Sequence, residues 1–336
     1  YDGSFSESSF GFRPGRSAHQ AVGRALEYFE NGKRKVVEMD LEKFFDRVNH
    51  DKLMSILRER ITNKPLLKLI RRYLQAGIME GGLVSLRTEG TPQGSPLSPI
   101  LSNILLDKLD KELEKRKLSF VRYADDCSIY VRSQRAERVL QSVTRFLEDK
   151  LLLRVNREKS KISRPDQCHL LGFGFRYKKG GCIPRVSERP KEQLKEKIRA
   201  ITKRNRGVSI QQVLEELNMV TRGWINYFRI AGCKTFLARL DGWIRIRLRT
   251  YIWKQWQFIR TRIKKLKQFD IPEWVALTVA KTRKGAVRIA STALSTIMTS
   301  EYLKGLGFIP MSEYYYVRTS CLMNRRVPNG THGGVR

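Results

Sequence analysis

The 336-residue sequence is short of acidic residues, with 33 Asp and Glu against 66 Lys and Arg and a formal net charge of +33. Such an excess of like charge favours a polyanionic partner. Nucleic acid is the leading candidate. An anionic membrane surface is less favoured, because the basic residues are spread through the whole chain rather than gathered on one terminal helix.

Long apolar runs and paired metal ligands are also missing. No apolar run approaches the roughly 18–20 residues of a membrane span, so we expect no membrane partner. The five cysteines form no C-x-x-C pair and the four histidines show no ligand spacing, which argues against a zinc site. Scattered cysteines are typical of a reducing compartment, and we expect a bacterial cytoplasm.

The start of the chain lacks both a signal peptide and an initiating methionine. Tyr1 already stands in what reads as the interior of a domain. We therefore expect that an N-terminal piece is missing, which leaves an organellar location open.

The length predicts about two domains, and a hydrophobic content of 41% is enough for a substantial core. The strongest boundary signal is the Lys-Lys-Gly-Gly run at residues 178–181, beyond which the pattern becomes largely helical. We expect one domain over residues 1–180, a helical domain over 185–300, and a basic C-terminal segment over 301–336 with a frayed end.

Two adjacent carboxylates, Asp125 and Asp126, stand between two short runs rich in aromatic and β-branched residues. This pattern predicts a β-hairpin with the acid pair at its bend. Turn chemistry alone explains many such pairs. However, neighbouring like charges are costly unless a cation holds them, and Mg²⁺ takes one or two carboxylates together with substrate phosphates.

A third carboxylate, Asp40, ends a predicted strand over residues 35–41. If this strand and the hairpin share one antiparallel sheet, Asp40 meets Asp125 and Asp126. Three converging carboxylates would hold two Mg²⁺ ions, which is the arrangement used for in-line phosphoryl transfer.

Residues 242–268 contain no Asp or Glu, and aromatic residues alternate there with Lys and Arg. A helix pair with a solvated charged face would explain part of this pattern. The complete absence of acid favours nucleic-acid contact instead. The candidate contact residues are Arg245, Arg247, Arg249, Lys254, Arg260, Arg262, Lys264 and Lys265.

An ordered series of sequence blocks resembles the reverse transcriptases, most closely the group II intron-encoded type, also called intron maturases. The series is more specific than any one block and covers nearly the whole chain. A further block over residues 223–228 resembles the signature of the maturase or thumb region. The blocks of the series are residues 9–17, 39–46, 90–99, 123–126, 155–161 and 171–173.

The resemblance implies an α+β fold of the right-hand polymerase type. It would have an antiparallel palm sheet, partial fingers and a helical thumb (maturase) domain. The implied enzyme is an RNA-directed DNA polymerase that joins dNTPs to a primer 3′-hydroxyl with two Mg²⁺ ions. The implied partners are intron RNA, whose splicing and mobility the protein would assist, an RNA template with a DNA or RNA primer, and dNTPs.

The resemblance also implies roles at matching positions. Asp40 and Asp125 would be the principal metal ligands, with Asp126 as the supporting carboxylate. The backbone carbonyl of Leu41 would also reach a metal. Lys159 would lie near the leaving pyrophosphate as an acid or electrostatic clamp.

Other implied residues would bind substrates. Phe45 would exclude a ribose 2′-hydroxyl, although simple core packing is an alternative for this ring. Gln93, beside Gly94, would contact the incoming nucleotide, unless it is an ordinary loop amide. Arg13 and Arg16 would lie along the template and the nucleotide, or be solvated charges. The implied primer grip is Leu171, Gly172 and Phe173.

The resemblance leaves other functions open. The chain could be an RNA-binding splicing cofactor without polymerase activity, or a host-adopted repair or defence reverse transcriptase. An RNA-dependent RNA polymerase is disfavoured, because Phe45 stands where such enzymes usually favour a ribose-accepting residue. The family's first fingers blocks are absent before residue 9, and no His-Asn-His nuclease is visible.

Overall fold

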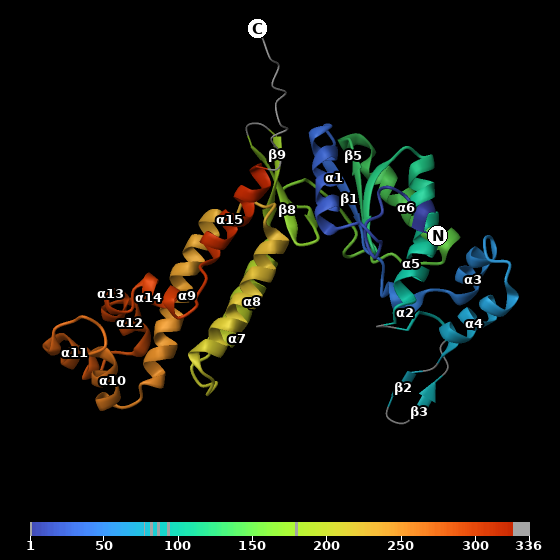
Figure 1. Ribbon diagram of the computed structural model, residues 1–336. Helices are drawn as coiled ribbons and strands as arrows, with labels where there is room; N and C mark the ends of the chain where they lie inside the picture. The colour runs from blue at the N-terminus through green and yellow to red at the C-terminus, as the bar shows by residue number, and fades with distance from the viewer. Residues whose placement is uncertain are drawn as a thin grey trace, which may run out of the picture. The chain divides into compact units, whose positions relative to one another are not determined.

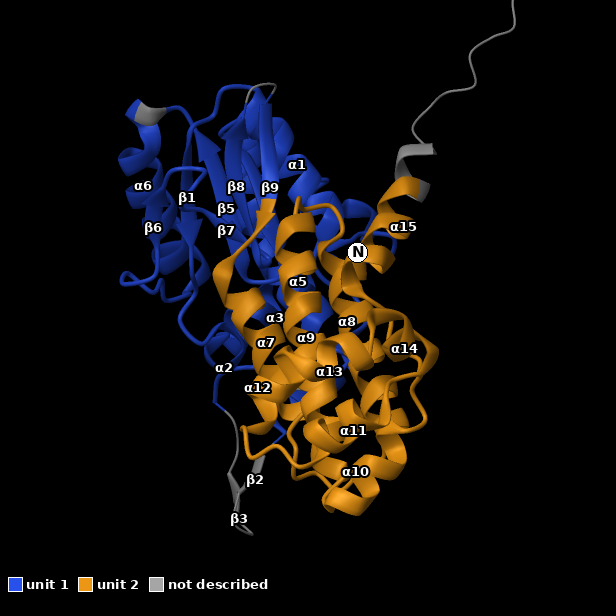
Figure 2. Ribbon diagram, turned by 90° about the vertical axis from the view of Figure 1, so that its left-hand side faces the viewer, with its two compact units in different colours: residues 1–184 blue, residues 185–336 orange. Residues whose placement is uncertain are grey.

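The computed structural model describes residues 2–76, 78–80, 83–85, 88–92, 95–178 and 181–324 (Figure 1). The chain divides into two compact units, Tyr1–Pro184 (unit 1) and Arg185–Arg336 (unit 2), which are coloured separately in Figure 2. In the described ranges, no helix combines the length and apolarity needed to cross a membrane.

Unit 1 combines strands and helices, in agreement with the predicted α+β class. Its helices are α1 (Ala18–Glu30), α2 (Phe44–Arg47), α3 (His50–Arg58), α4 (Lys64–Gln75), α5 (Ser98–Lys115) and α6 (Ala136–Leu151), with short 3-10 turns at Asp2–Ser4 and Ser133–Arg135. Its strands are β1 (Lys35–Met39), β2 (Ile78–Glu80), β3 (Leu83–Ser85), β4 (Ser119–Tyr123), β5 (Asp126–Val131), β6 (Lys161–Ser163), β7 (His169–Leu170), β8 (Phe173–Lys178) and β9 (Gly181–Val186), which runs on into unit 2.

A four-stranded antiparallel sheet in the order β4-β5-β1-β6 forms the centre of unit 1. Alternation along β1 sends Val37 and Met39 into the main hydrophobic core, which α3, α5 and α6 complete. On the other face, the ring of Tyr130 meets Phe29 of α1 at 5.2 Å between ring centroids. The predicted strand over residues 35–41 and the predicted hairpin are therefore neighbours in one sheet.

Two smaller sheets complete unit 1, one of β2 and β3 and one in the order β7-β8-β9. Local caps fix the starts of two helices in unit 1. Asn49 accepts a hydrogen bond from the Lys52 amide at 2.9 Å and begins α3. Ser17 and Gln20 form a reciprocal capping box at the start of α1.

Unit 2 is helical. Its helices are α7 (Glu188–Ile201), α8 (Ile210–Phe228), α9 (Lys234–Gln255), α10 (Ile259–Leu266), α11 (Glu273–Ala280), α12 (Ala286–Ser291), α13 (Ala293–Ile297), α14 (Ser300–Gly305) and α15 (Met311–Asn324). Buried Asp241 of α9 accepts hydrogen bonds from the amides of Met311 and Ser312 at 2.8 and 2.9 Å. Residues 301–324 therefore form α14, a connecting turn and α15 within unit 2, rather than the separate segment expected from residue 301 onward.

Candidate active site

The acid pair lies at the bend of a tight hairpin, as the sequence predicts. Tyr123 of β4 pairs with Asp126 of β5, and Ala124 and Asp125 form the two-residue turn between them. Ala124 has a φ of +56°, in the left-handed region that non-glycine residues rarely adopt. Something in the fold must hold this backbone conformation.

A buried arginine holds the turn. Arg122 has no exposed surface and pairs with Asp110 of α5 at 2.6 Å. Its guanidinium also donates to the Ala124 carbonyl at 2.9 Å and to the Asn103 side chain at 2.9 Å. Ser9 Oγ accepts a further hydrogen bond from it at 2.8 Å. Because a guanidinium has five donors in a fixed plane, this network defines where the turn lies relative to α5.

The N-terminal segment packs directly on the same turn. A Cβ atom placed on Gly11 would lie 2.2 Å from the Ala124 backbone nitrogen, so only glycine fits here. Asn103 donates from Nδ2 to the Gly11 carbonyl at 2.9 Å. The Phe10 amide donates to the Arg122 carbonyl, also at 2.9 Å. The block at residues 9–17 therefore supports the acid-bearing hairpin.

Asp40 follows β1 and is held by the block at residues 155–161. Its amide donates to Ser160 Oγ at 3.0 Å, and its carbonyl accepts from the Asn156 amide at 2.9 Å. Lys159 Nζ lies 4.0 Å from Asp40 Oδ2. Both side chains retain solvent exposure, so this ion pair is loose and free to rearrange around a ligand.

Asp40 and Asp125 open onto one cavity of about 470 Å³. Phe45 and Lys159 also line it. The ring of Phe45 packs edge-on against Phe44 at 5.2 Å between centroids and touches the core, so it combines core packing with a position in the cavity wall. The remaining lining residues are Leu41, Glu42, Lys43, Phe44, Asp46 and Asn156.

Negative charge accumulates at this end of the sheet. Partial burial, together with the negative charges of Asp125, Asp40 and Glu38, raises the pKa of Asp126 to about 6, and burial is the largest of these causes. Glu38 is two residues before Asp40 on β1, and one of its carboxylate oxygens is buried without a hydrogen-bond partner. The fold therefore brings three carboxylates close enough to act on Asp126.

These carboxylates do not by themselves provide a complete set of metal ligands. Among the described residues, no three His, Cys, Asp or Glu side chains are gathered so as to hold a metal ion. The donor chemistry nevertheless fits Mg²⁺, which prefers carboxylate oxygens and completes its shell with water and substrate phosphates. A site of this type needs only one or two protein carboxylates before the substrate arrives.

Comparison with known families identifies this arrangement. A family model described as reverse transcriptase (RNA-dependent DNA polymerase) matches residues 3–175, just over half of the chain. The chain belongs to the reverse transcriptase family. A second model, the group II intron maturase-specific domain, matches residues 191–269. Together the two matches confirm the predicted resemblance to group II intron reverse transcriptases and the polymerase-type α+β fold, in a family that generally depends on divalent metal ions.

Some curated proteins and solved structures are similar to this chain. Protein YkfC of Escherichia coli is 32% identical over 201 residues, covering 48% of this chain and 53% of that protein. The group II intron-encoded protein LtrA of Lactococcus lactis is 28% identical over 260 residues, covering 58% of this chain and 43% of LtrA. Apo telomerase from Candida tropicalis has a TM-score of 0.43 at 14% identity, covering 92% of this chain and 57% of that one. The chain thus spans about half the length of these curated relatives.

The structure describes only some of the residues that were predicted to bind substrates. Gln93 and Gly94 lie outside the described residues. The described start of their loop packs under Phe45, because the Thr91 amide donates to the Phe45 carbonyl at 2.6 Å. Leu171 and Gly172 form the turn between β7 and β8 with φ values of +53° and +81°, and Phe173 is fully buried. The Phe173 ring therefore belongs to the interior, and the primer-grip role of the turn at Leu171 and Gly172 stays a prediction.

Arg13 differs from the prediction. Its guanidinium donates to the carbonyl oxygens of Ser6 at 2.6 Å and Ser9 at 3.0 Å, and it pairs with Asp2 at 2.8 Å. With its donors occupied, Arg13 braces the N-terminal turn instead of lying along a template. Arg16 pairs with Glu7 and keeps partial exposure.

Three of the predicted nucleic-acid contacts are also used inside unit 2. Arg249 is buried and donates to the Met298 carbonyl at 2.8 Å, which contradicts its predicted role. Arg247 donates to Thr202 Oγ1 at 2.6 Å and lies over the Trp243 ring. Arg262 donates to the Trp256 carbonyl at 2.9 Å. Arg245, like Arg247 and Arg262, is partly exposed, and the exposed candidates are Lys254, Arg260, Lys264 and Lys265.

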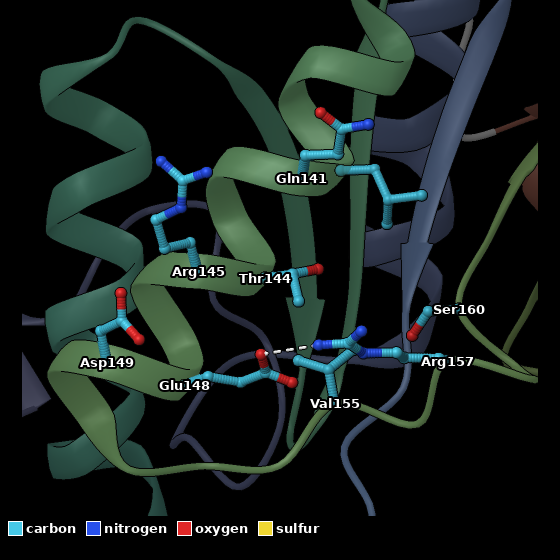
Figure 3. Close-up of a pocket in the computed structure, with 9 residues that line it drawn as sticks. Gln141, Thr144, Arg145, Glu148, Asp149, Val155, Arg157 and Ser160 are labelled. Carbon is cyan, nitrogen blue, oxygen red and sulfur yellow. Dashed lines mark hydrogen bonds and ion pairs between the residues drawn. The ribbon is translucent and has the colours of Figure 1, made fainter.

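The residues that support the site were not predicted from the sequence. Arg122 was visible as a lone charge inside an otherwise apolar strand, which is a signal for a buried polar network. A second cavity of about 530 Å³, shown in Figure 3, was not anticipated. It lies between α6 and the Asp40-holding block, where Arg157 pairs with Glu148 at 3.1 Å.

Proposed function

We propose that the chain is an RNA-directed DNA polymerase that adds dNTPs to a primer 3′-hydroxyl on an RNA template. The observation that carries this proposal is that Asp40 and Asp125, far apart in sequence, line one cavity with Phe45 and Lys159. Membership of the reverse transcriptase family supports it. The sheet of unit 1 would be the palm, the α3–α4 region part of the fingers, and unit 2 the helical thumb.

Each residue has a distinct task in this proposal. Asp40 and Asp125, with Asp126 and the Leu41 carbonyl in support, would hold two Mg²⁺ ions. When bound, these ions supply an activated hydroxyl nucleophile and neutralise charge on the leaving phosphates. Lys159 adds a positive charge at the cavity, where it can move from Asp40 to the pyrophosphate as that group leaves. Phe45 would exclude ribonucleotides by contact with the 2′-hydroxyl.

The polymerase proposal is tested by Mg²⁺-dependent dNTP incorporation on an RNA template with a DNA primer. Asp125→Ala should reduce incorporation by at least about a hundredfold, because a principal metal ligand is lost. Asp149→Ala is the matched control, since it removes an exposed carboxylate of α6 outside the Asp40–Asp125 cavity. Equal incorporation by the wild-type chain and Asp125→Ala would reject the proposal.

A second function, binding of intron RNA to assist splicing, is favoured by the maturase-specific match over residues 191–269. The exposed basic residues of α10 would contribute phosphate contacts to this RNA. Substitutions should affect polymerase activity and RNA binding independently. Asp125→Ala should spare RNA binding, whereas the double variant Lys264→Gln/Lys265→Gln should weaken RNA binding and spare single-nucleotide incorporation at saturating primer–template.

A further inference from the structure

Phe12 combines two properties that are individually uncommon. Its φ is +56°, in the left-handed region that bulky side chains rarely occupy. The residue is 54% exposed, so packing in the core does not compensate for the backbone strain. Glycine would satisfy this backbone at no steric cost. Strained residues of this kind persist where the surroundings force them, and they concentrate at functional sites.

Both chain neighbours of Phe12 are fixed by unit 1. On one side, the Gly11 carbonyl accepts from Asn103 Nδ2 at 2.9 Å, and the Gly11 backbone lies against Ala124. On the other side, Arg13 is anchored through three carbonyl oxygens and a carboxylate of the N-terminal turn. The backbone of Phe12 is therefore held rigidly, and the ring is the part directed into solvent.

The surroundings define what such a ring can bind. Because Gly11 touches Ala124, Phe12 lies beside the turn that carries Asp125 and Asp126. An apolar ring that faces solvent gains no favourable contact from water. A flat aromatic face, however, stacks well on a nucleobase and does so with little dependence on base identity. Because the backbone that carries the ring is already held, binding costs less conformational entropy than ordering a mobile segment would.

We propose that Phe12 is a substrate-contacting residue whose ring stacks on a nucleobase bound beside the Asp125 turn. The inference rests on the proposed polymerase function and deepens it. Two bases have this chemistry, one in the template strand and one in the incoming dNTP. The rigid Gly11–Phe12–Arg13 segment would serve as a fixed stop that sets where this base lies relative to the carboxylates.

The experiment compares Phe12→Gly and Phe12→Tyr with the wild-type chain. Phe12→Gly removes the ring and the left-handed strain together, so its thermal midpoint should stay unchanged or rise. Leu152→Gly is the matched control. Leu152 has a φ of +57° and is 51% exposed at the end of α6, and it does not line the Asp40–Asp125 cavity. Leu152→Gly should show the same stability response without any effect on substrates.

Two binding measurements identify which base is stacked. Primer–template affinity is measured by fluorescence anisotropy without dNTP, and KM for dNTP is measured at saturating primer–template. A template-strand contact predicts that Phe12→Gly weakens primer–template binding by about 5- to 150-fold, the range for one aromatic stack. A contact to the incoming base predicts a similar rise in KM alone. Phe12→Tyr should restore either value to near wild type.

The outcomes separate the inference from the function on which it rests. If Phe12→Gly matches the wild-type chain in both affinity and KM, the stacking inference is wrong and the polymerase proposal stands. If Leu152→Gly weakens binding as much as Phe12→Gly, the effect belongs to the backbone and the inference is again wrong. Undiminished incorporation by Asp125→Ala would instead overturn the polymerase proposal, while a binding loss confined to Phe12→Gly would still support base stacking.

Discussion

At the scale of single residues, the site depends on the fully buried ion pair of Arg122 and Asp110. Arg122 joins α5, the N-terminal segment and the acid-bearing turn through one guanidinium. A buried ion pair of this type contributes little net stability when complete, but breaking it leaves an uncompensated charge. Its value here is positional, because it fixes the turn to which Asp125 belongs.

Removing this guanidinium should be costly. Arg122→Leu leaves Asp110 buried without its partner, and we expect the free energy of unfolding to fall by about 3–5 kcal/mol. Urea unfolding followed by circular dichroism measures the change. Arg116→Ala breaks the more exposed pair with Glu112 on α5 and should cost less than about 1 kcal/mol. A similar decrease in the free energy of unfolding in the two variants would show that the buried Arg122 pair stabilises the fold no more than an exposed pair does.

The same residues show where sequence reasoning fails. Arg13 and Arg249 look like other arginines in a basic chain, and only the fold reveals that backbone carbonyls occupy their donors. An arginine on a helix is predicted to be exposed unless a distant segment covers it. For Arg249 that segment includes the Met298 carbonyl, far away in the sequence.

At the scale of elements, local signals were predictable and distant ones were not. β1, the hairpin and the Asn49 cap follow from alternation, turn residues and cap chemistry within a few neighbours. The start of α15 cannot be predicted from its sequence neighbours, because its cap is Asp241 of α9. The sequence-based expectation was a basic C-terminal segment from residue 301 onward, because nothing near residue 311 points to the distant Asp241 as its cap.

The cap from Asp241 predicts a stability effect at one element. Asp241→Ala removes acceptors for two backbone amides and for Ser312 Oγ at 2.6 Å. We expect a loss of about 1–2 kcal/mol and faster amide exchange at the start of α15, measured by hydrogen–deuterium exchange. Ser209→Ala, which removes the exposed cap of α8, should speed exchange at that helix alone. Unchanged exchange in α15 would contradict a capping role for Asp241.

At the scale of the whole molecule, the net charge of +33 pointed to a polyanionic partner. The sequence did not show which of these charges lie on the surface of the folded chain. Part of the positive charge in α9 and α10 is used internally, while Lys264 and Lys265 remain exposed at the end of α10. Electrostatic binding of a polyanion depends on the phosphates actually neutralised rather than on net charge. The chain should therefore bind nucleic acid with a salt dependence set by a subset of its cations.

This reasoning gives a prediction about salt. The affinity of the wild-type chain for structured RNA should fall steeply between about 50 and 200 mM salt, with a straight line of log affinity against log salt. Lys264→Gln/Lys265→Gln should flatten this slope by about 1 to 2, because each lost phosphate contact removes about one released counterion. The charge-matched variant Lys115→Gln/Lys117→Gln lowers the net charge equally at the end of α5. If both double variants change the slope alike, binding responds to total charge; a change confined to α10 places the RNA contact on unit 2.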